Sequence, residues 1–277
     1  MKTAILGLFA ETSIHPGNGQ NMGVVDLPVA REGATGYPVI VGSSMKGALR
    51  DKTRAMDGTP RGKESAGTKR LFGTQEAAAG ISVTDARLAL LPLRSLSGHY
   101  KWAICPYIIE RLQRDCQRMG YDYDSPKITV KEDQALVAEG EGILFLEELS
   151  FSKSPDPSLP SVGEVLAWLM PNQRLRDRLL SQLVIISDNQ FSYFAQHGLP
   201  VNARNVLDDG KKSTNLWYEE SLPPDSLFYT LLISRDDEDL AAVRELFASQ
   251  PYLQVGGNET IGYGWFKITW VDKLGRG

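Results

Sequence analysis

The chain has 277 residues, of which 42% are hydrophobic and 23% charged, and this composition excludes a disordered or fibrous protein. At about 150 residues per domain, the length predicts one large domain or one domain with sizeable insertions. Thirty Lys and Arg against 34 Asp and Glu give a net charge of −4, so no global basic field indicates nucleic-acid binding.

The charge is unevenly distributed along the chain. Residues 44–72 contain eight Lys or Arg and three Asp or Glu, a local charge of +5, whereas residues 205–250 contain four and ten, a local charge of −6. A basic segment inside a mildly acidic chain is typical of a polyanion-binding site, but a solvated helix face would have the same composition.

The two cysteines and the lengths of the apolar runs indicate the cellular compartment of the protein. Cys105 and Cys116 form no CxxC pair, which argues against a structural zinc site and fits a reducing compartment. No apolar run approaches the roughly 18 residues needed to span a membrane. The N-terminal apolar run stops at Glu11 without a cleavage pattern, as in a buried first strand. We therefore expect a cytoplasmic protein that is not associated with a membrane.

In the first half of the chain, the apolar run at residues 3–10 predicts a central strand. Frequent Gly and Pro predict a loop at 11–42, after which a helix is expected to begin near Ser43 and Ser44, with the serines as caps. The elements expected next are a Gly-rich basic loop at 58–80, a strand at 81–93 and a helix that opens at Cys105–Pro106.

In the second half, Ser161 and Glu164 resemble a capping box for a helix that runs through Met170, and a further helix is expected after Pro171. The other expected elements are strands at 127–131, 142–151, 184–187, 227–234, 252–255 and 262–271, a hairpin at 200–222, and a helix at 237–249. Together they predict an α+β fold, with helices on one face of an antiparallel sheet.

Two segments could bind a phosphate backbone. In Gly42-Ser43-Ser44-Met45-Lys46-Gly47-Ala48-Leu49-Arg50, a helix start offers free N–H groups, and Lys46, Arg50 and Arg54 recur along one stripe. The second is the turn from Gly256 to Trp265, whose glycines permit close approach of a partner. A capped surface helix and a plain hairpin turn are the alternatives for these two segments.

A third segment could carry chemistry. Asp26 lies between apolar residues in a Gly-bracketed loop, where a carboxylate could hold a divalent cation or a reacting hydroxyl. A turn-stabilising hydrogen bond is the more common fate of a lone Asp. His15 lies in the preceding part of the same loop, and only two further histidines occur in the chain.

Taken together, these segments resemble the RAMP superfamily of CRISPR proteins, and most of all the repeated backbone subunit of type III-B (Cmr) effector complexes. The residues that carry the resemblance are Leu8-Phe9-Ala10-Glu11-Thr12, His15-Pro16-Gly17, Gly23-Val24-Val25-Asp26-Leu27-Pro28-Val29, Thr35-Gly36-Tyr37-Pro38-Val39-Ile40, the helix start above, Leu71-Phe72-Gly73, Thr84-Asp85-Ala86-Arg87-Leu88, Leu216-Trp217-Tyr218-Glu219-Glu220-Ser221-Leu222-Pro223 and Gly256–Gly264. The match covers about the first hundred residues and the last eighty.

The resemblance implies a modified ferredoxin-like (RRM-related) fold with large insertions and a β-hairpin thumb. It implies a single RAMP domain over 1–277, with its core at about 1–119 and 184–277, an insertion at about 120–183 and the thumb at about 200–222. The implied partners are guide (CRISPR) RNA, complementary target RNA, further copies of the chain along the guide, and other subunits of the complex.

The resemblance also implies an endoribonuclease that is active in the assembled complex and cuts target RNA at regular intervals. Asp26 would be catalytic and would hold a divalent metal ion, magnesium or manganese, while a 2′-hydroxyl attacks its own phosphate; His15 and Glu220 are candidate helpers. The residues expected to bind RNA are Ser43, Ser44, Lys46, Arg50, Arg54, Arg204, Gly256, Gly257, Gly262 and Gly264.

Two other functions stay open. One is a non-catalytic RNA-binding scaffold in the same kind of complex. The other is a guide-RNA-processing endonuclease of the same superfamily, which would favour a histidine-based site. An aspartate at position 26, with one histidine nearby, argues against the processing enzyme.

Overall fold

The computed structural model describes residues 1–17, 19, 25–60 and 63–271. The strands are β1 (Lys2–Ala10), β2 (Val39–Ile40), β3 (Ile81–Val83), β4 (Ala86–Ser95), β5 (His99–Ile104), β6 (Gln134–Val137), β7 (Ile143–Leu146), β8 (Leu149–Pro155), β9 (Leu183–Ile185), β10 (Val201–Leu207), β11 (Ser213–Glu220), β12 (Leu227–Ser234), β13 (Tyr252–Gln254) and β14 (Trp265–Val271).

The helices are α1 (Gly42–Met56), α2 (Ala66–Phe72), α3 (Pro106–Arg118), α4 (Leu159–Trp168), α5 (Gln173–Gln182), α6 (Asp188–His197) and α7 (Asp237–Glu245), with a 3₁₀ turn, η1 (Glu259–Ile261). Among the helices in the described ranges, none combines the length and the apolar character that crossing a bilayer requires.

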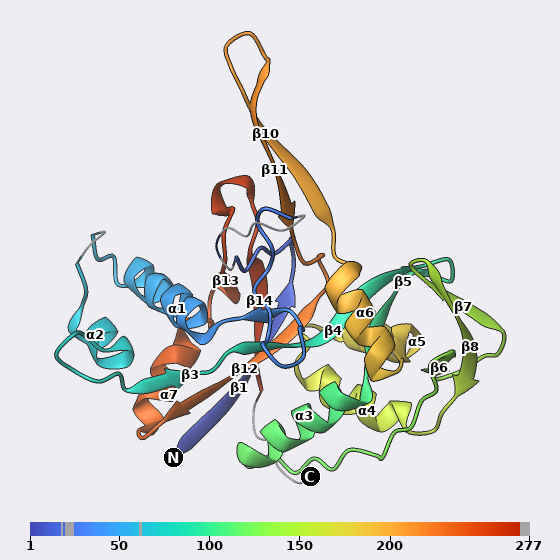
Figure 1. Ribbon diagram of the computed structural model, residues 1–277. Helices are drawn as coiled ribbons and strands as arrows, with labels where there is room; N and C mark the ends of the chain where they lie inside the picture. The colour runs from blue at the N-terminus through green and yellow to red at the C-terminus, as the bar shows by residue number, and fades with distance from the viewer. Residues whose placement is uncertain (18, 20–24, 61–62, 272–277) are drawn as a thin grey trace.

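One sheet runs across the molecule (Figure 1) in the order β13-β14-β1-β12-β4-β5-β9-β6-β8-β7, with β2 paired to β4 and β3 to β12. Most neighbours are antiparallel, but β5 is parallel to β9 and β6 is parallel to β8. The α+β class is confirmed, whereas the expectation of an antiparallel sheet is wrong. Parallel neighbours need a long crossover, and residues 105–182 supply it between β5 and β9.

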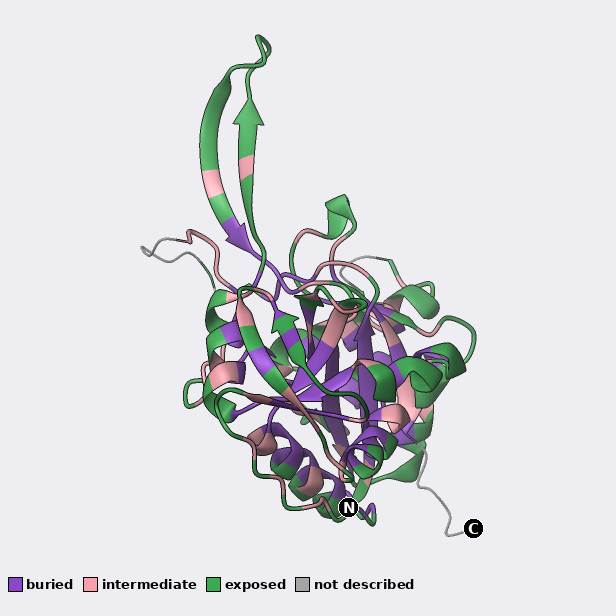
Figure 2. Cartoon of the chain, turned by 90° about the vertical axis from the view of Figure 1, so that its right-hand side faces the viewer, coloured by how far each residue is buried: buried purple, intermediate pink, exposed green. Residues whose placement is uncertain are grey.

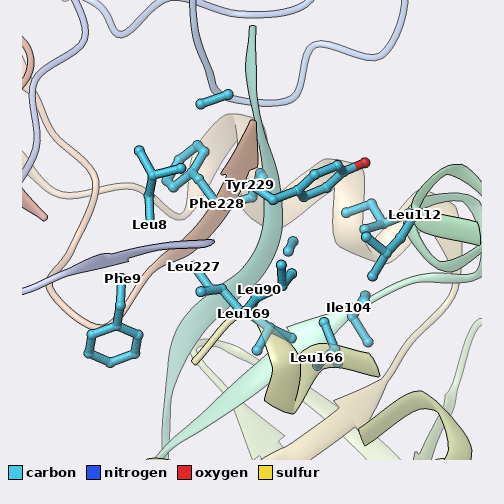
Figure 3. Close-up of a cluster of buried hydrophobic side chains, with 14 of the residues drawn as sticks. Leu8, Phe9, Leu90, Ile104, Leu112, Leu166, Leu169, Leu227, Phe228 and Tyr229 are labelled. Atoms are coloured by element: carbon cyan, nitrogen blue, oxygen red, sulfur yellow. The ribbon is translucent and has the colours of Figure 1, made fainter. Parts of the chain in front are cut away.

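Strand β1 lies inside the sheet, between β12 and β14, and seven of its nine residues are buried. Figure 3 shows Leu8 and Phe9 pointing to opposite faces of β1, and both residues belong to the buried core. A strand that is covered on both faces needs apolar residues at every position, which explains the continuous run in the sequence.

Gly7 lies directly against the backbone of the helical segment that follows β8. A Cβ atom at residue 7 would lie 2.2 Å from the carbonyl oxygen of Leu169, the residue that ends α4. No side chain fits in that space. The segment expected as an insertion therefore packs its backbone directly against the central strand.

Two expected helix caps are wrong. Helix α1 begins at Gly42, one residue before Ser43, with Val41 as its N-cap, and the N–H of Gly42 donates to Asp85 Oδ1 at 2.7 Å. Helix α4 begins at Leu159, so Ser161 and Glu164 lie inside it and form no capping box. Pro160 fixes this earlier start, because proline is favoured in the first turn of a helix.

Several other elements differ from the ones predicted from the sequence. The region 58–80 contains α2, which Ser65 caps, and the region 142–151 is divided into β7 and β8 at Glu147, where φ is 49°. In the described chain, residues 127–131 form no strand, and α6 is an additional helix. The strand at 227–234, the helix after Cys105 and the helix after Pro171 are confirmed.

The expected hairpin is confirmed as β10 and β11, which pair with each other and rise from the rest of the molecule (Figures 1 and 2). Most of its residues are exposed, including the apolar Val206, Leu207 and Leu216. Burial is confined to its base, where Glu219 and Glu220 lie.

Gly7→Ala should lower the free energy of unfolding by about 1–3 kcal/mol, because the added methyl group must displace backbone. Gly47→Ala is the control: its Cβ would meet nothing within 4 Å, and alanine favours a helix interior by up to about 1 kcal/mol. Chemical denaturation of both variants tests this. Equal effects would show that the contact with residue 169 does not constrain β1.

Candidate functional site

Three segments that are distant in the sequence meet at the base of the β10–β11 hairpin. In the N-terminal loop, Ile14 exchanges two backbone hydrogen bonds with Leu222, at 3.0 and 2.8 Å. Farther along this loop, Leu27 pairs with Glu219 in β11. From the glycine-rich turn, the N–H of Gly257 donates to the carbonyl oxygen of His15 at 2.9 Å. The structure therefore brings the His15 and Asp26 segments, the hairpin and the turn together.

Asp26 is half-buried, and one of its carboxylate oxygens is held by the hairpin. The N–H of Tyr218 donates to Oδ2 of Asp26 at 2.8 Å. On either side, the N–H of Leu27 donates to Tyr218 O and the N–H of Glu220 donates to Leu27 O, at 3.1 and 3.0 Å. Oδ1 has no hydrogen-bond partner within the ranges that the structure describes, so this oxygen can bind another molecule. Gly23 and Val24 of the same motif lie outside the described residues.

His15 is buried, and its ring is oriented by the same hairpin strand. Its Nδ1 lies 2.7 Å from the backbone carbonyl oxygen of Glu220. A carbonyl oxygen only accepts, so Nδ1 carries a proton, and in the neutral ring Nε2 is then an acceptor. A Cβ atom at Gly17 would lie 3.0 Å from Nε2, so a glycine keeps this edge of the ring uncrowded.

Both carboxylate oxygens of Glu220 are used inside the protein. Oε2 accepts from the N–H of Val29 at 3.0 Å, and Oε1 forms an ion pair with Arg31 at 2.6 Å. Arg31 also donates to the carbonyl oxygens of Gly36 and Ala195. In this arrangement Glu220 acts on the loop that carries Asp26: it fixes the loop three and five residues beyond the aspartate.

Glu219 is a site residue that the sequence analysis missed. It is buried, and its carboxylate contacts the side chain of Asn258 and lies 3.6 Å from Nδ1 of His15 and 3.5 Å from Nε of Arg204. It thus joins the His15 segment, the hairpin and the glycine-rich turn. The pair of adjacent acids at the end of the predicted strand could have indicated that both are site residues. Neighbours in a strand point to opposite faces and so reach different partners.

Arg204 lies on β10 opposite Trp217 of β11, and its guanidinium stacks 5.3 Å from the centre of the Tyr263 ring. Its Nε and Nη2 atoms are buried and have no hydrogen-bond partner among the described residues. The positive charge is partly balanced by Glu219, so Arg204 ties the hairpin to the glycine-rich turn.

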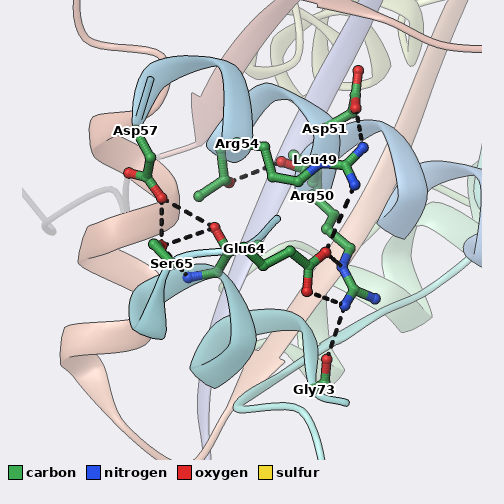
Figure 4. A network of polar contacts seen from close by, with 10 residues as sticks. Leu49, Arg50, Asp51, Arg54, Asp57, Glu64, Ser65 and Gly73 are labelled. Carbon is green, nitrogen blue, oxygen red and sulfur yellow. Dashed lines mark hydrogen bonds and ion pairs between the residues drawn. The ribbon is translucent and has the colours of Figure 1, made fainter. Parts of the chain in front are cut away.

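The basic stripe of α1 is largely neutralised within the protein, as Figure 4 shows. Arg50 donates to both oxygens of Glu64 at 2.6 Å and to the carbonyl oxygen of Gly73 at 3.2 Å. The hydrogen bonds from Arg50 lower the pKa of Glu64. Arg54 pairs with Asp51 and approaches Glu64.

Lys46 differs from the other two cations of the stripe. Within the described residues, no acidic side chain pairs with it. Ser43 and Ser44 are exposed beside it at the start of α1. Asp85 occupies the first N–H of the helix and adds a negative charge there, so Lys46 is the main cation that this helix end presents to a ligand.

A cavity of about 840 Å³ lies between α1 and the glycine-rich turn. Ser44 and Gly47 line it on one side, and Gly256, Glu259 and Trp265 on the other. Gly256 and Gly264 have positive φ, and a Cβ atom would lie 2.7 Å from the carbonyl oxygen of His15 and 2.4 Å from that of Val255. The two segments expected to bind a phosphate backbone thus border one groove.

The sequence of the chain matches the RAMP superfamily over residues 10–267. The chain belongs to the RAMP superfamily. This RAMP chain is 32% identical to the CRISPR system Cmr endoribonuclease Cmr4 of Pyrococcus furiosus, an alignment that covers 100% of this chain and 98% of that protein. The resemblance seen in the motifs therefore extends over the middle of the chain.

Solved structures agree with this RAMP assignment. The crystal structure of oligomeric Cmr4 from Pyrococcus furiosus superposes with a TM-score of 0.79 at 28% identity, over 99% of this chain and 100% of that one. A chain of the type III-B Cmr-beta complex bound to cognate target RNA superposes with a TM-score of 0.75 at 19% identity, over 98% of both chains, and shares the fold.

Glu220→Gln should loosen the loop that carries Asp26, because the ion pair with Arg31 is lost; hydrogen bonds to charged groups contribute about 1.5–3 kcal/mol. Amide hydrogen exchange at Leu27 and Val29 should accelerate. Glu64→Gln, which breaks an ion pair at α1, is the matched control and should leave these two amides unchanged. Unaltered exchange in Glu220→Gln would contradict the positioning role.

Proposed function

We propose that this RAMP protein is a guide-RNA-binding backbone subunit of a type III-B CRISPR effector complex that cleaves complementary target RNA at regular intervals. Its partners would be guide RNA, target RNA, further copies of itself and other subunits. The observation that carries the proposal is the Asp26 carboxylate, fixed at the base of a projecting hairpin, whose Oδ1 has no hydrogen-bond partner among the described residues. Whole-chain similarity to a Cmr endoribonuclease supports it.

The proposed chemistry is attack of a 2′-hydroxyl on the adjacent phosphate. The hairpin separates guide from target and holds one target nucleotide out of the duplex beside Asp26. The hydroxyl oxygen then bonds to phosphorus, the bond to the 5′-oxygen breaks, and the departing 5′-oxygen takes a proton from water, so the products carry a cyclic phosphate and a 5′-hydroxyl. Asp26 orients the attacking hydroxyl, His15 Nε2 is available to accept its proton, and Glu220 keeps the loop in place.

The proposed cofactor is a divalent metal ion, magnesium or manganese. Within the described ranges, no three His, Cys, Asp or Glu side chains are grouped as a metal site. Magnesium is commonly held by one or two carboxylates together with substrate phosphates, so the residues present fit an ion whose remaining ligands come from RNA. Asp26 would hold it, and the ion would neutralise charge that develops on the phosphate.

We infer that the sheet derives from a modified ferredoxin-like (RRM-related) arrangement. The second candidate function is a non-catalytic RNA-binding scaffold.

Asp26→Asn in every copy of an assembled complex should bind guide and target normally and leave target RNA uncut. The amide oxygen still accepts from Tyr218, so the loop is retained, whereas the charge is lost. Proton-transfer catalysis contributes about 10²–10⁴-fold, so the cleavage rate measured with labelled target should fall by at least about tenfold. Robust cutting by this variant would leave only the scaffold function.

Lys46→Ala should weaken binding of single-stranded RNA and reduce the slope of log affinity against log salt by about 0.7, the contribution of one phosphate contact. Arg50→Ala is the control: Arg50 is already paired with Glu64, so its slope should change less. Titrations at several salt concentrations measure both. An unchanged slope in Lys46→Ala would remove α1 from the RNA-binding surface.

A further inference from the structure

Trp265 lines the groove between α1 and the glycine-rich turn, and 41% of its surface is exposed. Among the described residues, no ring or cation stacks on its indole and none accepts a hydrogen bond from it. Tyr252, on the neighbouring strand, differs in having Lys267 5.8 Å from its ring centre. A large flat apolar surface is thus left without a partner inside a concave site.

The strand register places Trp265 on the floor of this groove. Trp265 pairs with Gln254, and Lys267 pairs with Tyr252, so these four side chains lie on the same face of β13 and β14. Phe266 and Leu253 alternate to the other face and are buried. Lys52 of α1 donates to the carbonyl oxygens of Gln250 and Tyr252, both at 3.0 Å. Helix α1, which forms one side of the groove, and strands β13 and β14, which form its floor, are therefore fixed relative to each other before any ligand binds.

The groove and a smaller hollow beside it differ in the charged residues that line them. The charged residues that line the groove are Glu11, Asp51, Lys52, Arg54 and Glu259. This mixture has a slight negative excess and does not favour a phosphate. A smaller hollow of about 440 Å³ shares Arg54 with the groove, and its other lining residues are Lys63, Glu64 and Lys69. Arg54 is paired with Asp51, and Glu64 with Arg50, so Lys63 and Lys69 are the cations that make this hollow suitable for a phosphate.

We propose that the groove takes one unpaired nucleobase of the guide RNA, stacked on Trp265, while the phosphate of that nucleotide lies in the hollow beside Arg54. A nucleobase is flat and uncharged, as the groove requires, and its phosphate carries the charge that the hollow requires. Gly47 lines the groove without any neighbour at its Cβ position, which leaves room for the base. The inference rests on the proposed function, because it assumes that the bound RNA is single-stranded guide.

The test measures binding of the full-length chain to labelled single-stranded RNA and to an RNA of equal length in which the bases are absent. Stacking contributes about 1–3 kcal/mol per base, so Trp265→Leu should weaken binding of ordinary RNA by about 5- to 150-fold and leave binding of abasic RNA unchanged. Trp265→Phe should restore most of the affinity. Tyr193→Leu removes an aromatic that is 39% exposed and does not line the groove, and should have no effect.

Equal losses for ordinary and abasic RNA, or no loss in Trp265→Leu, would overturn the stacking site. If Lys46→Ala weakens binding while Trp265→Leu does not, only this inference fails; if the unaltered chain binds neither RNA, the proposed function fails with it. In the assembled complex, Trp265→Leu should reduce the guide RNA retained, with no change in the affinity of a guide-loaded complex for target. The opposite pattern would overturn the assignment to guide.

Discussion

The arrangement of the site depends on a loop without regular structure that is hydrogen-bonded to the last residues of β11. Leu27 pairs with this strand through its backbone, and Glu220 binds Val29 and Arg31 through its buried carboxylate. The next residue, Glu32, forms an ion pair with Arg111 of α3 at 2.7 Å. Successive residues thus connect the loop to the hairpin and to a core helix, so the position of Asp26 is fixed by the body of the molecule.

The glycine-rich turn contacts both the proposed RNA-binding groove and the proposed catalytic residues. Gly256 borders the groove beside α1, while Gly257 donates to His15 and Asn258 contacts Glu219. A conformational change in the part of the turn that borders the groove would therefore be transmitted to the His15 ring through only one or two residues. Positive φ at Gly256 and the close approach of the His15 carbonyl oxygen permit only glycine at that position.

Much of the fold was predictable from local pattern, because β1, β12, α3 and the hairpin have apolar periodicities or turn residues that tertiary contacts reinforce. The caps of α1 and α4 were not, since Asp85 and Pro160 decide where those helices begin. The convergence of Asp26, His15 and the hairpin could be expected only from family resemblance. The neutralisation of Arg50 by Glu64 and the role of Glu219 depend on side chains brought together by the fold, and spacing along the chain does not encode these distances.

The place of β1 in the sheet has a consequence for synthesis. Its two neighbours, β12 and β14, both come from the last 51 residues, 227–277. At about 5–20 residues per second, roughly 10–45 s separate the emergence of β1 from that of its first partner. During that interval a nine-residue apolar strand has two unpaired edges. The nascent chain therefore has to be shielded from aggregation until its C-terminal strands arrive, and truncation near the C-terminus would be more damaging than its distance from the N-terminal strand suggests.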